Sequence, residues 1–123
     1  MKKRKVGVLI SGNGSNLQAL IDACAAKDYP AEITAVISNR ESAFGINRAR
    51  EAGIPAHIVS HRDYPSREAF DAAIHELLEH HNVEIVCLAG FMRLLSPWFV
   101  NAWKGRLLNI HPSLLPDFRG AKA

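Results

Sequence analysis

Residues 6–16 read Val-Gly-Val-Leu-Ile-Ser-Gly-Asn-Gly-Ser-Asn, an apolar run that ends in a polar, glycine-rich loop. A continuous apolar run closed by Ser-Gly is typical of a strand buried on both faces. The residues that follow carry an apolar stripe at helical spacing, formed by Leu17, Leu20, Ile21 and Cys24. Ser15 and Gln18 have the spacing of a capping box, in which two side chains satisfy the first backbone amides of a helix. This stretch therefore predicts a buried strand, a tight loop and a helix N-terminus.

The rest of the chain repeats this alternation of β-rich runs and helical periodicity. Further strands are predicted over residues 33–37, 56–59, 84–89 and 106–110. Helices are predicted over residues 43–52 and around the stripe of Phe70, Ile74, Leu77 and Leu78. Strict alternation indicates an α/β fold whose sheet is mainly parallel, with helices on both faces. In such a sheet, ligands bind beyond the carboxyl ends of the strands.

Length, composition and charge exclude several classes of protein. The 123 residues suffice for one compact domain, and 48% hydrophobic with 22% charged residues excludes a disordered chain or a coiled coil. The net charge of +3 depends on Lys2, Lys3, Arg4 and Lys5, because the remaining 11 basic residues are balanced by 12 acidic residues. We therefore expect no nucleic-acid partner.

The sequence also predicts where the protein is located and the state of its two cysteines. The apolar run at residues 6–10 is shorter than the roughly 7 to 15 residues of a signal peptide, and no run approaches the roughly 18 needed for a membrane span. We expect a cytoplasmic protein with no membrane partner. Cys24 and Cys87 are 63 positions apart in apolar stretches, which favours buried thiols over a disulfide or a metal site.

The loop over residues 12–16 is a candidate phosphate site, because a helix N-terminus offers free backbone amides and a positive dipole end. The dinucleotide fingerprint is incomplete, since Leu17 stands where its third glycine belongs and Ser38-Asn39-Arg40 replaces its acidic residue. The Gly-Lys-Ser/Thr of a P-loop is also missing. A sugar monophosphate fits this loop better than NAD or ATP, while a plain βα turn remains the alternative.

Six histidines suggest a metal, but their spacing does not support one. His75 and His80 are five positions apart, which is about 140° of rotation around a helix, so their imidazoles do not converge. We interpret His80 and His81 as solvated residues at a helix end and predict no metal site.

Two other segments carry candidate chemistry. Asn109 and His111 alternate at the end of a predicted strand, which would place an amide donor beside an imidazole on one side. Such a pair suits a developing oxyanion and a proton transfer, although a polar strand end is equally compatible. Residues 91–100 are apolar and aromatic around Arg93. This pattern fits a core helix with Arg93 directed outward, or a wall for a flat aromatic ligand.

Three motifs together carry a family resemblance. In chain order, they are Ile10-Ser11-Gly12-Asn13-Gly14-Ser15-Asn16, Gly90-Phe91-Met92-Arg93-Leu94-Leu95-Ser96-Pro97 and Asn109-Ile110-His111-Pro112-Ser113-Leu114-Leu115-Pro116. The chain thereby resembles the glycinamide ribonucleotide formyltransferases, which are folate-dependent formyltransferases of purine biosynthesis. The last motif is shared with other folate-dependent formyltransferases.

The resemblance implies a Rossmann-like formyltransferase fold and a reaction. A formyl group would pass from 10-formyltetrahydrofolate, the co-substrate, to the amino group of glycinamide ribonucleotide, with no metal. By similarity, the substrate phosphate would be held by Gly14, Ser15 and Asn16. The folate would contact Arg67, Met92, Arg93, Leu94, Leu95 and Asn109, and the catalytic residues would be Asn109 and His111.

One family feature has no counterpart before Ala123, namely the catalytic Asp of a later loop, and the family's last strands and C-terminal helix are absent as well. We therefore expect residues 1–123 to be the N-terminal portion of a single formyltransferase domain. The alternatives are a formyltetrahydrofolate hydrolase, a formyltransferase for another amine, and a truncated, inactive nucleotide-binding module. The motif Phe118-Arg119-Gly120-Ala121 also resembles the first two of these.

Overall fold

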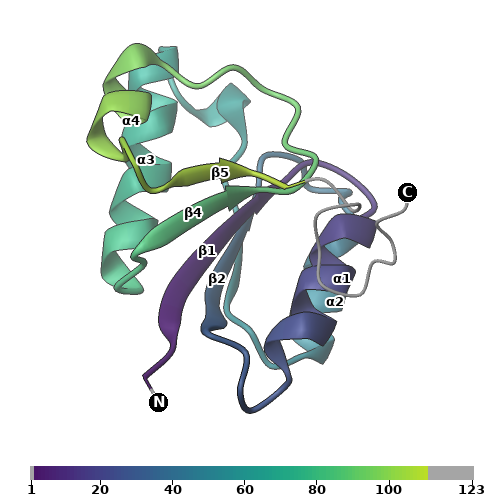
Figure 1. The fold of residues 1–123 in the computed structure, drawn as a ribbon. Coiled ribbons are helices and arrows are strands. Elements are labelled where there is room, and N and C mark those ends of the chain that lie inside the picture. Colours follow the sequence, from purple (N-terminus) through teal and green to yellow (C-terminus); the bar gives the residue numbers. More distant parts are fainter. Residues whose placement is uncertain (1, 111–123) are drawn as a thin grey trace.

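The computed structural model describes residues 2–110, which form a five-stranded sheet between helices (Figure 1). The strand order is β3-β2-β1-β4-β5, and every neighbouring pair is parallel. The strands are β1 (Arg4–Ile10), β2 (Ala31–Ser38), β3 (Ala56–Ile58), β4 (Ile85–Leu88) and β5 (Leu107–Asn109). Each of the five predicted strands is present, and the last three are shorter than predicted because their ends turn into loops.

Two helices cover each face of the sheet. The helices are α1 (Ser15–Cys24), α2 (Gly45–Glu51), α3 (Arg67–His80) and α4 (Pro97–Ala102), and a 3₁₀ turn η1 (His61–Asp63) precedes α3. Figure 1 shows α1 and α2 together on one side and α3 and α4 on the other. The predicted parallel α/β architecture is confirmed.

The central strand β1 is buried on both faces, as its apolar run predicts. Val8 and Ile10 pack in the core beneath α1 and α2, whereas Leu9 packs with Phe70 of α3 and Phe99 of α4. Burying a side chain of this size stabilises a fold by roughly 1.5 to 3 kcal/mol, so β1 anchors both layers. The chain leaves β1 toward β2 and later returns to its other side as β4. Ligands bind at such a switch point, beyond the carboxyl ends of the strands.

The predicted capping box at the start of α1 is wrong. Gly14 is the N-cap, in a left-handed conformation with φ 84°, and it makes no side-chain cap hydrogen bond. Ser15 is already the first helical residue, so its hydroxyl lies one position too late to cap the helix. Gln18 instead donates from Nε2 to Asp22 Oδ1 at 2.9 Å.

The apolar segment over residues 91–100 is only partly helical. Its first six residues form a loop, and α4 begins at Pro97. Ser96 caps this helix, because its Oγ accepts from the Phe99 amide at 3.2 Å. Phe99 is buried, as a core role predicts, whereas Trp98 and Val100 are 47% and 45% exposed. Among residues 2–110, no helix combines the length and apolar character needed to cross a bilayer.

Candidate functional site

Ser11 joins three loops at the carboxyl edge of the sheet. Its Oγ donates to Oδ1 of Asn39, which follows β2, at 2.6 Å. The same oxygen accepts from the backbone amide of Met92, which follows β4, at 2.7 Å. Ser11 and Asn39 are both buried. One hydroxyl therefore fixes the glycine-rich loop, the β2–α2 loop and the 91–95 segment relative to one another.

The glycine-rich loop lies against the start of α2 at a contact that only glycine permits. A Cβ on Gly14 would lie 2.6 Å from Cα of Gly45, and one on Gly45 would lie 2.4 Å from Cδ1 of Ile10. The Gly45 amide donates to the Gly12 carbonyl at 3.1 Å. The first turns of α1 and α2 are consequently in van der Waals contact.

Arg48 of α2 holds this loop from the side. Its Nε donates to the Asn13 carbonyl at 2.9 Å, and Nη2 donates to Asn13 Oδ1 at 2.7 Å. Arg48 could not be identified from the sequence, because no local pattern links it to a residue 35 positions earlier. Beyond the clamped Asn13, Ser15 is exposed and Asn16 is half-buried at the N-terminus of α1. This arrangement can hold an anion with backbone amides and short polar side chains.

The segment over residues 91–95 presents apolar side chains and one cation. Met92 and Leu94 are 71% and 74% exposed, respectively, whereas Phe91 and Leu95 pack against the core. Arg93 is half-buried, with its guanidinium carbon 5.3 Å from the centroid of the Phe70 ring. Its Nε is buried without a hydrogen-bond partner among the described residues. Arg93 is therefore not the outward-directed arginine of a core helix, and it retains hydrogen-bonding capacity for an anion.

Asp71 of α3 anchors the far end of this segment. Its side chain is completely buried, and Oδ2 accepts from the Ser96 amide at 2.6 Å. This contact was not predicted from the sequence. A signal existed, because Asp71 lies three positions before Ile74 and seven before Leu78, on the apolar stripe of the helix.

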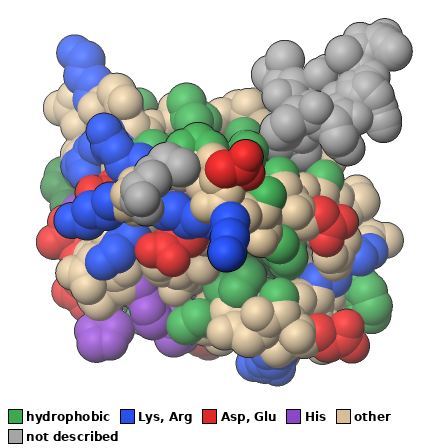
Figure 2. Space-filling model, turned by 60° about the horizontal axis from the view of Figure 1, so that its bottom comes forward, with side chains coloured by type: hydrophobic (Ala, Val, Ile, Leu, Met, Phe, Trp, Pro, Cys, Tyr) green, Lys and Arg blue, Asp and Glu red, His purple; other side chains and the backbone are tan. Residues whose placement is uncertain are grey.

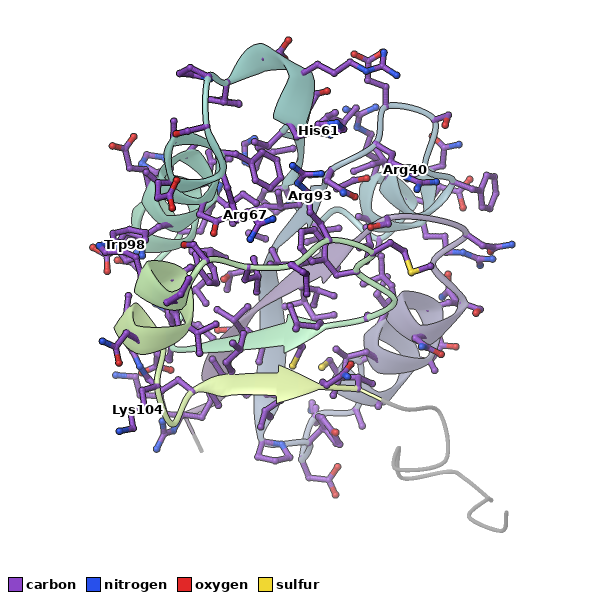
Figure 3. The ribbon with its side chains drawn as sticks, turned by 90° about the horizontal axis from the view of Figure 1, so that it is seen from above. Arg40, His61, Arg67, Arg93, Trp98 and Lys104 are labelled. Carbon is purple, nitrogen blue, oxygen red and sulfur yellow. The ribbon has the colours of Figure 1, made fainter. Side chains whose placement is uncertain are left out.

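Figure 3 shows Arg67 and Arg93 next to one another. Arg67 is the exposed first residue of α3, one turn before Phe70, over whose ring Arg93 lies. The preceding Ser66 caps the helix by accepting from the Ala69 amide at 3.1 Å. The structure thus brings together the two arginines that the sequence assigned to one ligand, and their role stays a prediction.

Asn109 ends β5 directly beside β4. It pairs with Leu88, and the following Ile110 amide donates to the Leu88 carbonyl at 2.9 Å. The Asn109 side chain is exposed at the carboxyl edge of the sheet. His111 lies outside the described residues, so its predicted position beside Asn109 stays a prediction.

Three histidines among the described residues, His57, His75 and His81, form hydrogen-bonding contacts. His75 accepts from Trp103 Nε1 at 3.1 Å, across the α3–α4 interface. His81 is half-buried, and its Nε2 lies 2.9 Å from Nε2 of His57 on β3, so the expectation that it is simply solvated is wrong. Figure 2 shows histidine side chains gathered at one corner of the surface. Residues 2–110 contain no group of three or more side chains placed to hold a metal ion.

The pKa values of these groups follow from burial. Burial lowers the pKa of both His57 and His81, and the neighbouring imidazoles lower it further. Burial raises the pKa of the Cys24 thiol, and it raises the pKa of the Cys87 thiol to about 11. Both cysteines are free. Cys87 is buried, as the sequence predicts, whereas Cys24 is only half-buried. The raised pKa of each favours the protonated thiol, which is the less reactive form.

Comparison with known proteins identifies a family. The formyl transferase family matches residues 4–123. The chain is 59% identical over 123 residues to the trifunctional purine biosynthetic protein adenosine-3 of Chironomus tentans, a match covering 98% of this chain and 9% of that protein. It is 53% identical over 113 residues to the phosphoribosylglycinamide formyltransferase of Escherichia coli K12, covering 92% of this chain and 53% of that enzyme.

Solved structures agree with this grouping. The crystal structure of phosphoribosylglycinamide formyltransferase from Brucella melitensis superimposes with a TM-score of 0.87 at 48% identity. That match covers 98% of this chain and 62% of the other. The chain thus spans about half to three fifths of these single-function relatives.

Proposed function

This chain belongs to the formyl transferase family, and from that premise we propose that the protein containing it makes a formylated purine precursor. The reaction is transfer of a formyl group from 10-formyltetrahydrofolate to the amino group of glycinamide ribonucleotide, in de novo purine (IMP) biosynthesis. One observation carries the proposal: Ser11 brings the glycine-rich loop and the 91–95 segment to one edge of the sheet. The Escherichia coli relative, named for this reaction, is 53% identical.

The ribose phosphate of glycinamide ribonucleotide is assigned to Gly14, Ser15 and Asn16. The contact between Gly14 and Gly45 and the clamp from Arg48 support this assignment, because they hold the N-terminus of α1 open and rigid. Rigid amides bind an anion without first losing conformational freedom.

The folate is assigned to Arg67, Met92, Arg93, Leu94, Leu95 and Asn109. Exposed Met92 and Leu94 offer an apolar surface to a flat ring. Among the described residues, the buried Nε of Arg93 has no hydrogen-bond partner. Arg67 lies one helical turn before Phe70, the residue whose ring lies beneath Arg93. Two guanidinium groups suit the terminal carboxylates of the folate.

The chemistry assigned to the strand end is stabilisation of an oxyanion. The substrate amine attacks the formyl carbon, and the carbonyl oxygen becomes negative in a tetrahedral intermediate. The Asn109 amide donates to that oxygen, and protonated His111 stabilises it or supplies a proton. A proton then passes from the attacking amine to the departing folate nitrogen, which restores the carbonyl as the C–N bond to the folate breaks.

The test is formyl transfer by the full-length protein with both substrates. The variant Asn109→Ala should lose roughly 10² to 10³ in kcat, the usual effect of removing one oxyanion donor. Asn101→Ala on α4 is the matched control, because Asn101 is exposed and lies outside the three motifs. Absence of turnover in the wild type, or full activity in Asn109→Ala, contradicts the proposal. Formate release without any amine would instead identify a hydrolase.

We further propose that residues 1–123 form the N-terminal portion of a single formyltransferase domain that works in the cytoplasm. The match to 53% of the Escherichia coli enzyme supports the first statement. Two small, water-soluble substrates are in keeping with the second.

A further inference from the structure

Asn13 of the glycine-rich loop has a side chain whose orientation is set by its partner. Nη2 of Arg48 donates to Asn13 Oδ1 at 2.7 Å, and Nε of Arg48 donates to the Asn13 carbonyl at 2.9 Å. A guanidinium group can only donate hydrogen bonds, so the carboxamide atom that faces Arg48 must be the oxygen. The Nδ2 group therefore points away from Arg48, and within residues 2–110 it donates to no protein atom. Asn13 thus keeps a free donor directly before the N-terminus of α1.

Two further contacts hold Arg48 itself in place. Its Nη1 donates to Gln18 Oε1 at 3.4 Å, and its guanidinium carbon lies 5.1 Å from the centroid of the Phe44 ring. Within residues 2–110, Arg48 forms no salt bridge, so no carboxylate there neutralises its charge. A fixed donor beside an uncompensated cation suits an anion better than a neutral ligand.

We propose that Asn13 donates from Nδ2 to the phosphate of glycinamide ribonucleotide, and that Arg48 is the positioning residue that fixes this side chain. The inference rests on the proposed function, which assigns that phosphate to the three residues directly after Asn13. A phosphate monoester presents several acceptor oxygens, so a side-chain donor adds to the backbone amides of the loop. Because Arg48 already orders the Asn13 side chain, binding does not have to supply that entropy.

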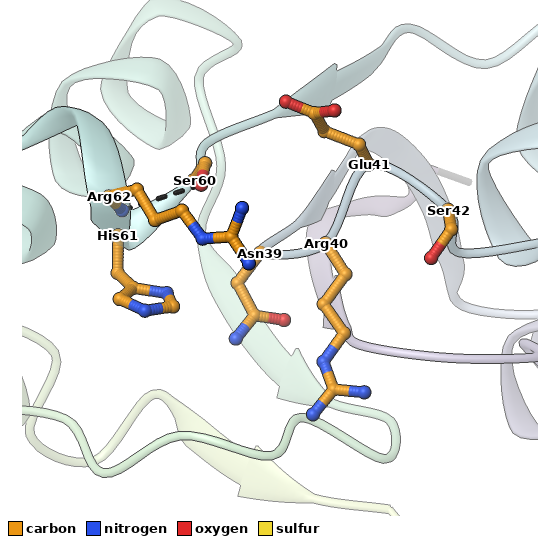
Figure 4. A pocket seen from close by; sticks show the side chains of 7 residues that line it. All are labelled: Asn39, Arg40, Glu41, Ser42, Ser60, His61 and Arg62. Atoms are coloured by element: carbon orange, nitrogen blue, oxygen red, sulfur yellow. Dashed lines mark hydrogen bonds between the residues drawn. The ribbon is translucent and has the colours of Figure 1, made fainter.

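A hollow at the carboxyl ends of β2 and β3 is the rival place for the phosphate. It has a volume of about 450 Å³, and Arg40 and Arg62 are among the residues that line it (Figure 4). Both arginines are exposed, and within residues 2–110 their side chains form no hydrogen bonds with the protein. An anion bound there would have to order two long side chains, whereas the donors of the glycine-rich loop are already fixed. The loop is therefore the better site for the phosphate.

The variant Asn13→Asp separates a ligand donor from a purely structural contact. The carboxylate keeps an acceptor for Arg48, but it replaces the Nδ2 donor with an oxygen that repels phosphate. Asn47→Asp is the matched control, because it makes the same change of charge at an exposed residue of α2 next to Arg48 in the sequence. The full-length protein is assayed for the KM of both substrates, for the inhibition constant of inorganic phosphate and for the midpoint of urea unfolding.

The phosphate measurements should change and the others should not. A hydrogen bond to a charged group contributes about ten- to hundred-fold in affinity, so Asn13→Asp should raise the KM for glycinamide ribonucleotide at least about ten-fold. The inhibition constant of inorganic phosphate should rise with it. The KM for 10-formyltetrahydrofolate should stay within about two-fold, and the unfolding midpoint should not fall, because Arg48 keeps its acceptor. Asn47→Asp should leave all four quantities close to those of the wild type.

The variant Arg48→Lys tests the positioning role. Lysine keeps the charge but cannot donate to the Asn13 carbonyl and side chain with a rigid fork. We expect the KM for glycinamide ribonucleotide to rise by about two- to ten-fold, the usual effect of leaving one side chain to be ordered on binding. In an Asn13→Ala background the same change should have almost no effect, because Arg48 acts through Asn13. Equal effects in both backgrounds would refute the positioning role.

Other outcomes overturn the inference. An unchanged KM for glycinamide ribonucleotide in Asn13→Asp excludes the donor while formyl transfer still proceeds. A raised KM with unchanged inhibition by inorganic phosphate would assign Nδ2 to the ribose instead. A lower unfolding midpoint, or an equal rise in both KM values, would mean that the substitution damages the loop as a whole. A raised KM in Arg62→Gln but not in Asn13→Asp would place the phosphate in the hollow of Figure 4. If the wild type transfers no formyl group, the proposed function fails together with this inference.

Discussion

The variant Ser11→Ala tests whether one hydroxyl organises the site. The substitution removes a donor to Asn39 Oδ1 at 2.6 Å and an acceptor for the Met92 amide at 2.7 Å. Alanine keeps the backbone and fills most of the same volume, so the change isolates these two hydrogen bonds.

The expected loss of stability follows from the surroundings of Asn39 and of the Met92 amide, the two groups that each lose a hydrogen bond. Asn39 is 6% exposed, so its freed carbonyl oxygen finds little water, and an unsatisfied buried group costs about 1 to 3 kcal/mol. The Met92 amide lies in a partly buried position, and losing that bond costs about 0.5 to 1.5 kcal/mol. We expect the free energy of unfolding to fall by roughly 2 to 4 kcal/mol.

The assay is urea unfolding of the full-length protein, read together with amide hydrogen exchange. The midpoint should fall without a change in slope, and the Met92 amide should exchange faster than in the wild type. Ser42→Ala is the control, because Ser42 is exposed and should change stability by no more than about 0.5 kcal/mol.

Two results would refute this reasoning. An unfolding midpoint equal to that of the wild type would mean that the two hydrogen bonds add nothing to stability. Unchanged protection of the Met92 amide, even with lower stability, would mean that Ser11 does not position the 91–95 segment.

Three further predictions concern the glycine-rich loop, Asp71 and the pair of His57 and His81. Gly14→Ala should lower the free energy of unfolding by about 1 to 3 kcal/mol, because φ at this position is 84° and the new Cβ would meet Gly45. The same change should raise the KM for glycinamide ribonucleotide. An unchanged KM would contradict this prediction. Asp71→Ala should cost about 1.5 to 3 kcal/mol in urea unfolding, and Asp71→Asn less because it keeps an acceptor; equal losses would argue against the hydrogen bond. Burial lowers the pKa of His57 and His81 below the ordinary 6.5, so the unfolded chain binds their protons more readily. Stability should therefore be full above about pH 6.5 and decline as the pH falls below it, and this decline should be shallower in His57→Gln.

The fold could be predicted because its signals are local. The apolar run at residues 6–10 and the helical stripe after it identify a buried strand and its crossover helix, and their repetition identifies a parallel sheet. The confirmed family resemblance likewise depended on contiguous motifs. The capping box failed because its spacing also fits a glycine N-cap one residue earlier, and only the backbone conformation of Gly14 distinguishes the two.

The supports of the site could not be predicted, because they join residues far apart in the chain. The Met92 amide donates to Ser11, which lies 81 positions earlier in the sequence, and Arg48 donates to Asn13, which lies 35 positions earlier. Nothing in either local sequence encodes such a partner. Arg93 illustrates the same limit, since its guanidinium lies over the Phe70 ring of α3, 23 positions earlier in the sequence.

The place of β1 between β2 and β4 has a consequence for how the chain folds. The first βαβ unit pairs β1 with β2 across a short stretch of sequence, so it can assemble early during synthesis. Pairing of β1 with β4 joins Val6 to Ile85, a much longer loop to close, and must come later. Ser11 binds Met92 only after that closure. Ligand binding at this edge thus reports that β4 has docked beside β1.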